Sequence, residues 1–203
     1  MLKKYLKIAL INIYKQKIFT IISILGLSIG LAVFLVIFGY VQFENSYDTF
    51  NKNIDNIYRL DSRVSINGIT LNRNTTSIPA APLIKQEIPA IKASTRFTSL
   101  VNQQIKINNE LFDENKFFFV DESVFNLFTF PIIKGNQSSL SEPFSLFISE
   151  SMSGKYFGNK DAVGRRITVI FNRLNKEYTF TIKGIVKDAP SNSHIKFNFL
   201  ASN

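Results

Sequence analysis

The longest uncharged apolar run of the chain lies near its N-terminus. Residues 18–43 contain no charged side chain, whereas Lys17 precedes them and Glu44 follows them. A helix of this length would extend roughly 39 Å, enough to cross about 30 Å of bilayer hydrocarbon. A cleaved signal peptide fits poorly, because its apolar core would be shorter and would end in small residues. The pattern therefore predicts an uncleaved transmembrane helix over residues 18–43, in contact with the lipid bilayer.

A second apolar pattern begins where this run ends. Five apolar side chains recur at intervals of four and three positions, with polar residues between them. This spacing predicts that the membrane helix continues outside the bilayer as a stalk helix over residues 44–57. A rigid stalk would carry motion between the membrane and the domain beyond it. The seam of this stalk consists of Phe43, Tyr47, Phe50, Ile54 and Ile57.

From residue 58 the hydrophobic period shortens towards two, which is typical of strands. Asn67-Gly68 predicts a hairpin turn, and Pro79 and Pro89 bracket a predicted helix over residues 80–87. This hairpin and helix, with the further strands and helices given in the next sentence, predict an α+β extracytoplasmic domain over residues 58–203. We expect further strands over 93–98, 104–107, 117–120, 167–171 and 178–186, the last two joined across 172–176, and helices over 122–128 and 150–157, with Asp121 and Ser149 as N-caps.

The positive charge of the chain gathers at its N-terminus. The formal net charge is +9, and residues 1–17 hold five lysines without an acidic side chain. The positive-inside rule therefore predicts a cytoplasmic basic N-terminus over residues 1–17 and a periplasmic main domain on an inner-membrane protein. Because more than half of the excess charge sits in this short segment, it indicates a membrane anchor and argues against nucleic acid as a partner.

Within the predicted span, Gly26 and Gly30 form a G-x-x-x-G pattern. Small residues at this spacing let another helix approach closely, so the pattern predicts helix packing in the membrane. The alternative is that glycine is simply common in membrane helices. The span holds no ionisable side chain that would indicate a proton or ion path.

Candidate residues for catalysis or metal binding are scarce. The chain has no cysteine and one histidine, which excludes thiolate and multi-histidine metal sites. No nucleophile motif accompanies His194, so we interpret it as a hydrogen-bonded structural residue of a loop. Gly158 and Gly164 have the wrong spacing for a phosphate loop and predict a turn. The adjacent acids at 113–114 and 121–122 are better explained by capping and solvation than by acid–base catalysis. We therefore expect no catalytic residue, cofactor or metal site.

Phenylalanine is unusually frequent, with twenty in the chain. Most of these rings must form the core, because a small domain without disulfides depends on apolar burial. An exposed minority could form a contact surface for lipid, peptide or another subunit.

Several ordered stretches resemble the MacB-like (FtsX-like) ABC transporter permeases. The resemblance extends from the end of the predicted span to the C-terminus, and its stretches occur in the family's order. They are ENSYDTF (44–50) with IYR (57–59); IPAI (88–91) with ASTR (93–96); VD (120–121) with Phe125, FTFP (128–131) and KG (134–135); ISE (148–150) with YFG (156–158) and VG (163–164); and GIVKDAP (184–190) with SHIKF (193–197).

This resemblance implies a permease subunit with four transmembrane helices and a large periplasmic domain between the first two. A partner ABC ATPase subunit would drive motion that the permease relays to this domain, for export or extraction of peptides, drugs or lipoproteins. The family also implies a dimer with a second permease copy and admits a periplasmic or outer-membrane partner. No cofactor is expected, except ATP in the partner ATPase. Residues 1–203 would then be an N-terminal fragment, without the ATPase domain of the fused members.

Two other classes fit parts of the sequence. A single-span, membrane-anchored extracytoplasmic sensor or binding module would share the anchor and the outer domain, but the basic N-terminus of 17 residues is too short for a signalling domain. An anchored extracytoplasmic enzyme is disfavoured, because the sequence shows no catalytic constellation.

Overall fold

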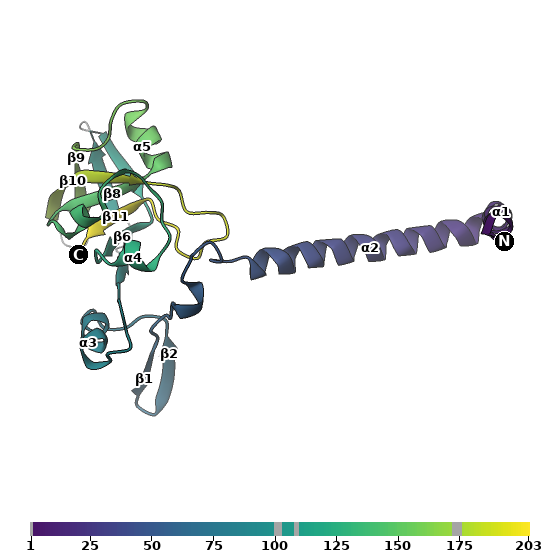
Figure 1. Ribbon diagram of the computed structural model, residues 1–203, viewed down its shortest axis with the longest axis horizontal. Helices are drawn as coiled ribbons and strands as arrows, with labels where there is room; N and C mark the ends of the chain where they lie inside the picture. The colour runs from purple at the N-terminus through teal and green to yellow at the C-terminus, as the bar shows by residue number, and fades with distance from the viewer. Residues whose placement is uncertain (1, 100–102, 108–109, 172–175) are drawn as a thin grey trace. The chain divides into compact units, whose positions relative to one another are not determined.

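The computed structural model describes residues 2–99, 103–107, 110–171 and 176–203. The chain forms two compact units, residues 1–47 and 48–203. The first unit contains helix α1 (Leu2–Lys15), which the sequence patterns do not predict, and helix α2 (Lys17–Asn45) (Figure 1). The two helices are separated at Gln16, whose φ of −109° and ψ of 57° depart from helical geometry. Helix α2 is long and apolar enough to cross a membrane.

The stalk helix predicted over residues 44–57 does not form. Helix α2 ends at Asn45, and Asp48 has a φ of 57°. A residue in this left-handed region cannot continue a right-handed helix. A single 3₁₀ turn, η1 (Ile54–Asn56), follows instead. The prediction is wrong because Phe50, which its spacing assigns to the stalk seam, packs against the core of the second unit.

The second unit, residues 48–203, is called the core domain below. Its described residues build a mixed sheet in the order β3-β6-β11-β8-β10-β9-β4-β5, with β7 also paired to β10. The β8–β10 and β6–β11 pairs are parallel, and the other neighbours are antiparallel. The strands are β3 (Phe97–Ser99), β4 (Gln103–Ile107), β5 (Glu110–Glu114), β6 (Phe117–Val120), β7 (Ile132–Gly135), β8 (Ser145–Ser149), β9 (Arg166–Phe171), β10 (Lys176–Val186) and β11 (Phe199–Ser202).

The central strands of this sheet bury both of their faces. In β8, Leu146 and Ile148 join one core cluster, whereas Phe147 joins the other. Helix α5 (Glu150–Phe157) contributes Met152 and Tyr156 to the first cluster. Helix α4 (Val124–Leu127) contributes to the second cluster, together with η2 (Gln137–Ser141). Strands covered on both faces read as continuous apolar runs without alternation.

Outside the main sheet, the core domain contains a two-stranded hairpin and a short helix. Strands β1 (Ser62–Ile66) and β2 (Ile69–Arg73) pair antiparallel around Asn67-Gly68, which confirms the predicted turn. Both turn residues have positive φ, as such hairpins require. Helix α3 (Ala80–Glu87) occupies the predicted residues, and Ser149 caps α5 by accepting a hydrogen bond from the Met152 N–H.

Other local predictions are less accurate. Helix α4 is shorter than predicted, and its N-cap residue is Ser123 rather than Asp121. Strands β5, β7 and β8 are not predicted, and β3 begins later than the expected strand over 93–98. Strands β9 and β10 pair as the expected hairpin, but residues 172–175 of its loop lie outside the described residues. Most of these errors concern short strands, whose position depends on their neighbours in the sheet.

Candidate functional site

In the segment of the chain that follows α2, long-range polar contacts are centred on Asp48. Its backbone N–H donates to the Asn192 carbonyl over 2.9 Å. Its carboxylate accepts the backbone N–H of His194 at 3.0 Å and lies 2.7 Å from the His194 ring Nδ1. Asp48 and His194 are 146 positions apart in the sequence. These contacts hold the chain that follows α2 onto the loop between β10 and β11.

A second anchor lies three residues further along. Asn51 is buried, with 3% of its surface exposed. Its side-chain oxygen accepts the Thr129 N–H at 2.9 Å, and its amide nitrogen donates to the Asp48 carbonyl at 3.1 Å. The Lys52 N–H in turn donates to the Thr129 hydroxyl at 3.0 Å. Residues 48–52, called the junction segment below, are therefore bound to two separate loops of the core domain.

The residues predicted to form the stalk seam do not share one helix face. Phe43 and Tyr47 form an edge-to-face ring pair with centroids 5.3 Å apart, as an i, i+4 spacing allows. Phe50 packs against the second core cluster, whereas Ile54 begins η1 with 37% of its surface exposed. Ile57 ends η1 in an extended conformation. The structure thus replaces the predicted stalk with a bound junction segment.

Gly26 and Gly30 both lie within α2, as predicted. A Cβ atom at either position would meet no described atom within 4 Å. Both positions can therefore be substituted without a clash inside this chain. Their role in helix packing in the membrane stays a prediction.

The interpretation of His194 as a hydrogen-bonded loop residue is confirmed by its contacts with Asp48. The turn predicted at 158–164 is also confirmed, since Gly158 and Gly164 have positive φ and the segment joins α5 to β9. A phosphate loop would lie between a strand and a helix in the opposite order. Among the described residues, no group of three or more histidine, aspartate or glutamate side chains is placed to hold a metal ion.

The acid pairs of the sequence take part in ion pairs within the core domain. Asp121 accepts the Arg96 backbone N–H at 2.9 Å and binds the guanidinium at 2.5 Å. Burial alone raises the pKa of the Asp121 carboxyl, but hydrogen bonds from Arg96 and Asn203 outweigh it and hold the pKa below its ordinary value. The pair borders a cavity of about 370 Å³ that Lys85 and Ser94 also line. Because Asp121 is matched by Arg96, it is unsuited to act as a general base.

The other acid pair supplies Glu114, a carboxylate with 6% of its surface exposed. It binds Lys155 Nζ at 2.5 Å, the Tyr156 hydroxyl, and Asn198 Nδ2 at 3.3 Å. Burial and the neighbouring Glu114 raise the pKa of the Tyr156 hydroxyl. This network joins β5, α5 and the residue that precedes β11, and it explains why a buried acid is tolerated.

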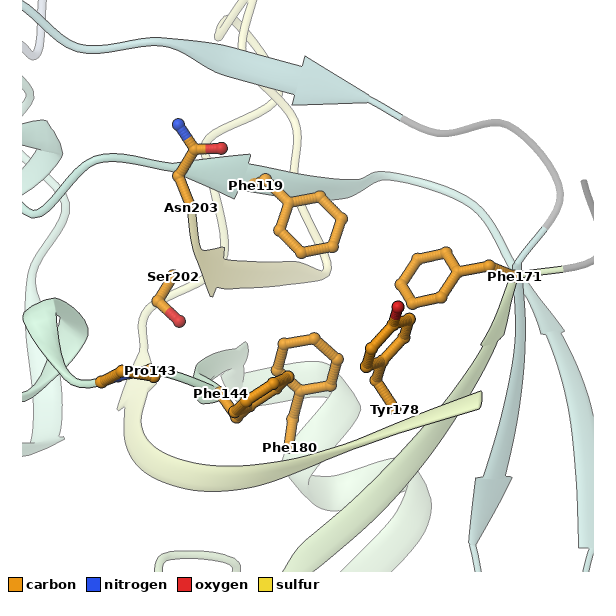
Figure 2. Close-up of a pocket in the computed structure, with 8 residues that line it drawn as sticks. All are labelled: Phe119, Pro143, Phe144, Phe171, Tyr178, Phe180, Ser202 and Asn203. Atoms are coloured by element: carbon orange, nitrogen blue, oxygen red, sulfur yellow. The ribbon is translucent and has the colours of Figure 1, made fainter. Parts of the chain in front are cut away.

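An aromatic pocket of about 320 Å³ opens beside β6, β9 and β10. Figure 2 shows the rings of Phe119, Phe171, Phe180 and Tyr178 around a common space. Phe144 stands at this pocket with 50% of its surface exposed. It belongs to the exposed minority of phenylalanines that the composition predicted, whereas Phe117, Phe147 and Phe199 are fully buried, as expected for the majority.

Sequence reasoning misses the functional candidates Asp48, Asn51 and Thr129. By periodicity, Asp48 is a polar residue off the stalk seam, and Asn51 is one of many polar positions. Their partners lie 77 to 146 positions away. Local periodicity cannot reveal such pairs. The signal that does include Asp48 and His194 is the family resemblance, in the stretches ENSYDTF and SHIKF.

Comparison with known proteins extends this picture. The sequence model described as "MacB-like periplasmic core domain" matches residues 20–201. A solved domain assigned to a permease protein from Porphyromonas gingivalis is 27% identical; the match covers 60% of this chain and 55% of that one, with a TM-score of 0.51. This chain therefore spans about half the length of that solved domain. No curated protein matches the chain.

Two further solved structures are similar at lower identity. The periplasmic region of MacB from Actinobacillus actinomycetemcomitans is 22% identical, over 60% of this chain and 51% of that one, with a TM-score of 0.44. The extracellular domain of the ABC-type transporter YknZ from Gram-positive bacteria is 12% identical, over 53% and 51%, with a TM-score of 0.37.

Proposed function

Because the chain belongs to the family of MacB-like periplasmic core domains, we propose that it is a subunit of an ABC transporter permease that relays motion to its core domain. A partner ABC ATPase drives this motion, so the chain itself catalyses no reaction and needs no cofactor of its own. The cargo that we propose is a peptide, a drug or a lipoprotein, which the transporter exports or extracts.

The observation that carries this proposal is the extent of the family match. The match begins at residue 20, inside α2, and ends at residue 201, inside β11. The membrane helix and the core domain therefore belong to one family unit. This continuity supports a function that needs both parts, as the relay of motion across a membrane does.

The charge distribution supports an orientation. Five lysines and no acidic residue lie within residues 1–17, before and at the start of α2. We propose on this basis that the N-terminus is cytoplasmic and that the core domain is periplasmic, on a protein of the inner membrane. The cytoplasmic side is where a partner ATPase finds ATP. A second permease copy completes the proposed transporter, and Gly26 and Gly30 offer a packing position for other spans.

Purification from the native host tests the proposal. We expect the tagged protein, extracted in mild detergent, to co-purify with an ABC ATPase and to show ATP hydrolysis that vanadate inhibits. A tagged variant in which α2 is replaced by an unrelated apolar helix serves as the matched control and should lose the ATPase. If the native protein purifies without an ATPase and without ATP hydrolysis, the permease proposal fails and a single-span sensor or binding module becomes the better explanation.

A further inference from the structure

We propose that the aromatic pocket of the core domain binds an uncharged aromatic small molecule the size of two fused rings. This pocket is the one of about 320 Å³ that opens beside β6, β9 and β10. The binding itself does not depend on the proposed function, but the role of the ligand as cargo rests on it. The inference narrows the proposed cargo from a peptide, a drug or a lipoprotein to a compact small molecule.

Five aromatic rings form a closed circuit around the pocket. Each ring contacts the next one, with neighbouring centroids 5.5–6.2 Å apart. A planar aromatic group among them can stack on one ring and meet the edge of another, the two arrangements that aromatic pairs favour. The circuit runs from Phe144 through Tyr178, Phe171, Phe119 and Phe180 back to Phe144 (Figure 2).

The curvature of the sheet creates this pocket. Strands β6 and β9 are separated by β11, β8 and β10 in the strand order. Neighbouring strands lie about 4.8 Å apart, so a flat sheet would separate β6 from β9 by roughly 19 Å. The ring centroids of Phe119 in β6 and Phe171 in β9 are instead 5.9 Å apart. The sheet therefore curls round, and the mouth of a curled sheet is a common place for a ligand site.

Packing in the core fixes the inner walls of the pocket. Phe171 and Phe180 are buried members of the first core cluster. Phe119 and Tyr178 are partly buried and pack against the same cluster. Rings that are already held by their neighbours lose little conformational freedom when a ligand binds, so more of the contact energy is retained as affinity.

Phe144 differs from these four rings, because half of its surface is exposed at the mouth of the pocket. Its φ of 57° is an outlier for a bulky residue. The Phe144 carbonyl accepts the Thr181 N–H at 2.9 Å, which ties this strained residue to β10. A half-exposed ring on a strained backbone contributes little to folding, whereas such strain is typical of binding sites. This combination indicates that the Phe144 ring contacts a ligand.

The lining favours an uncharged ligand. The described residues that line the pocket include no charged side chain. Residues 48–203 hold 19 basic and 14 acidic side chains, so the surroundings do not attract a cation. This balance disfavours a quaternary ammonium ion, the usual ligand of an aromatic cage. Tyr178, Ser202 and Asn203 supply polar atoms that can orient a hydroxyl or carbonyl group on an otherwise apolar ligand (Figure 2).

The size of the pocket and the backbone around it favour a compact molecule over an extended chain. The volume is roughly twice that of a cavity of about 150 Å³ that accepts benzene, which gives room for two fused rings. An extended peptide would need a free strand edge for its main-chain hydrogen bonds. Strands β6, β9 and β10 offer no such edge, because each has a partner strand on both sides.

Photoaffinity labelling of the full chain in lipid nanodiscs tests this inference. Benzophenone is uncharged, carries two aromatic rings and forms covalent adducts at nearby C–H bonds under illumination. Peptide mass spectrometry then locates the adducts, so labelling of the pocket is distinguished from labelling of α2 within the lipid. We expect saturable labelling of peptides that contain Phe119, Phe144 or Tyr178, and we expect 2-naphthol to prevent it.

Two variants separate ligand binding from folding. Phe144→Gly removes the ring at the mouth, and glycine accepts the positive φ without strain. We expect labelling to fall about fivefold to tenfold, as for the loss of one aromatic contact, while the midpoint of urea unfolding stays unchanged. Ile133→Ala is the matched control, because Ile133 is 51% exposed and its strand β7 pairs with the end of β10 that is remote from Tyr178. This control should be labelled like the unmodified protein.

Two further competitors test the chemistry of the ligand. Decahydro-2-naphthol has the ring framework of 2-naphthol without its aromatic character, so it should compete about fivefold less well. Tetramethylammonium tests the pocket as a cation cage and should not compete. Equal competition by decahydro-2-naphthol, or effective competition by tetramethylammonium, would overturn the assignment of an uncharged aromatic ligand.

The outcomes also separate this inference from the proposed function. If no peptide of the pocket is labelled, or if Phe144→Gly is labelled as strongly as Ile133→Ala, the inference fails and the permease proposal stands. If the pocket is labelled as expected but no ABC ATPase co-purifies with the native protein, the binding site is supported. The permease proposal then fails, and the role of the ligand as cargo fails with it.

Discussion

The carboxylate of Asp121, the residue directly after β6, binds the guanidinium of Arg96 at 2.5 Å and also accepts the Arg96 backbone N–H. Both side chains are about three-quarters buried, with 27% of the Arg96 surface and 25% of the Asp121 surface exposed. Arg96 precedes β3, so this pair fixes the entry of the chain into the edge of the sheet.

Asp121→Asn should lower the stability of the core domain and flatten its dependence on pH. We expect a loss of about 2 kcal/mol near neutral pH, as for a hydrogen-bonded charged group. Because the folded-state pKa of Asp121 lies below its ordinary value of 3.8, the stabilisation is present above that value and is lost as pH falls through the lower folded pKa. Urea unfolding of the full chain in detergent at several pH values, followed by tyrosine fluorescence, measures both effects.

The exposed Arg59–Asp61 pair provides the matched control. Its side chains are 73% and 51% exposed, so Asp61→Asn should change the free energy of unfolding by less than about 1 kcal/mol. If Asp121→Asn retained the acid-dependent loss of stability of the unmodified protein, this account of the Arg96–Asp121 pair would be wrong.

Gly184 in β10 should not tolerate a side chain. A Cβ atom there would overlap the ring of the buried Phe147 and lie 2.9 Å from the Lys134 carbonyl oxygen. Neither β7 nor β8 can move away easily, since both pair with β10. We expect Gly184→Ala to cost about 1–3 kcal/mol of unfolding free energy in urea titrations.

Gly154 is the matched control for that change. It lies within α5, and a Cβ atom would meet nothing within 4 Å. Gly154→Ala should stabilise the protein by about 0.5–1 kcal/mol, because alanine has the higher helix propensity. Equal effects of the two substitutions would refute the steric explanation.

Asn51→Ala should loosen the junction segment and lower stability. In the unmodified protein the Thr129 N–H donates to the Asn51 side chain. The substitution removes this acceptor. An unsatisfied buried donor costs about 1–3 kcal/mol, which urea unfolding would detect. Amides of residues 48–52 should also exchange faster with deuterium. The control is Asn72→Ala in the exposed strand β2, whose free energy of unfolding should stay within about 0.5 kcal/mol of that of the unmodified protein. An equally small effect of Asn51→Ala would show that Asn51 is not an anchor.

Gly26 and Gly30 should matter for association between spans and not for folding of the core domain. Leucine at both positions would keep neighbouring backbones apart, so we expect weaker association in a bacterial two-hybrid assay or by energy transfer in vesicles. Gly39→Leu, outside the pattern, is the control, since a Cβ atom added at any of the three glycines would meet no described atom within 4 Å. Equal association in both variants would argue that these glycines are incidental.

Several local elements could be predicted because neighbouring residues alone determine them. Asn67-Gly68 favours the positive φ values of a tight hairpin turn, and Ser149 caps α5 with its own hydroxyl. In the same way, the uncharged run from residue 18 to 43 is apolar enough to specify a helix without tertiary partners.

Other elements could not be predicted because they depend on distant partners. Strand β8 lies between β10 and β11 and is buried throughout, so it lacks the alternation that marks an exposed strand. The stalk prediction failed for a related reason. The spacing of Phe43, Tyr47 and Phe50 is helical, but burial of Phe50 in the core and the contacts of Asp48 with His194 favour a turn over another helical turn.

The sequence by itself determined the long apolar helix α2, the α+β character of the domain and the membership of the MacB-like family, because these depend on composition, periodicity and ordered local motifs. Only the tertiary structure decided where the helix stops and which residues hold the chain beyond it. Asp48 and His194 gain their relationship from a fold that brings positions 146 residues apart into hydrogen-bond contact. Hydrogen bonds and side-chain packing act over a few ångströms in space, and separation along the chain does not limit them.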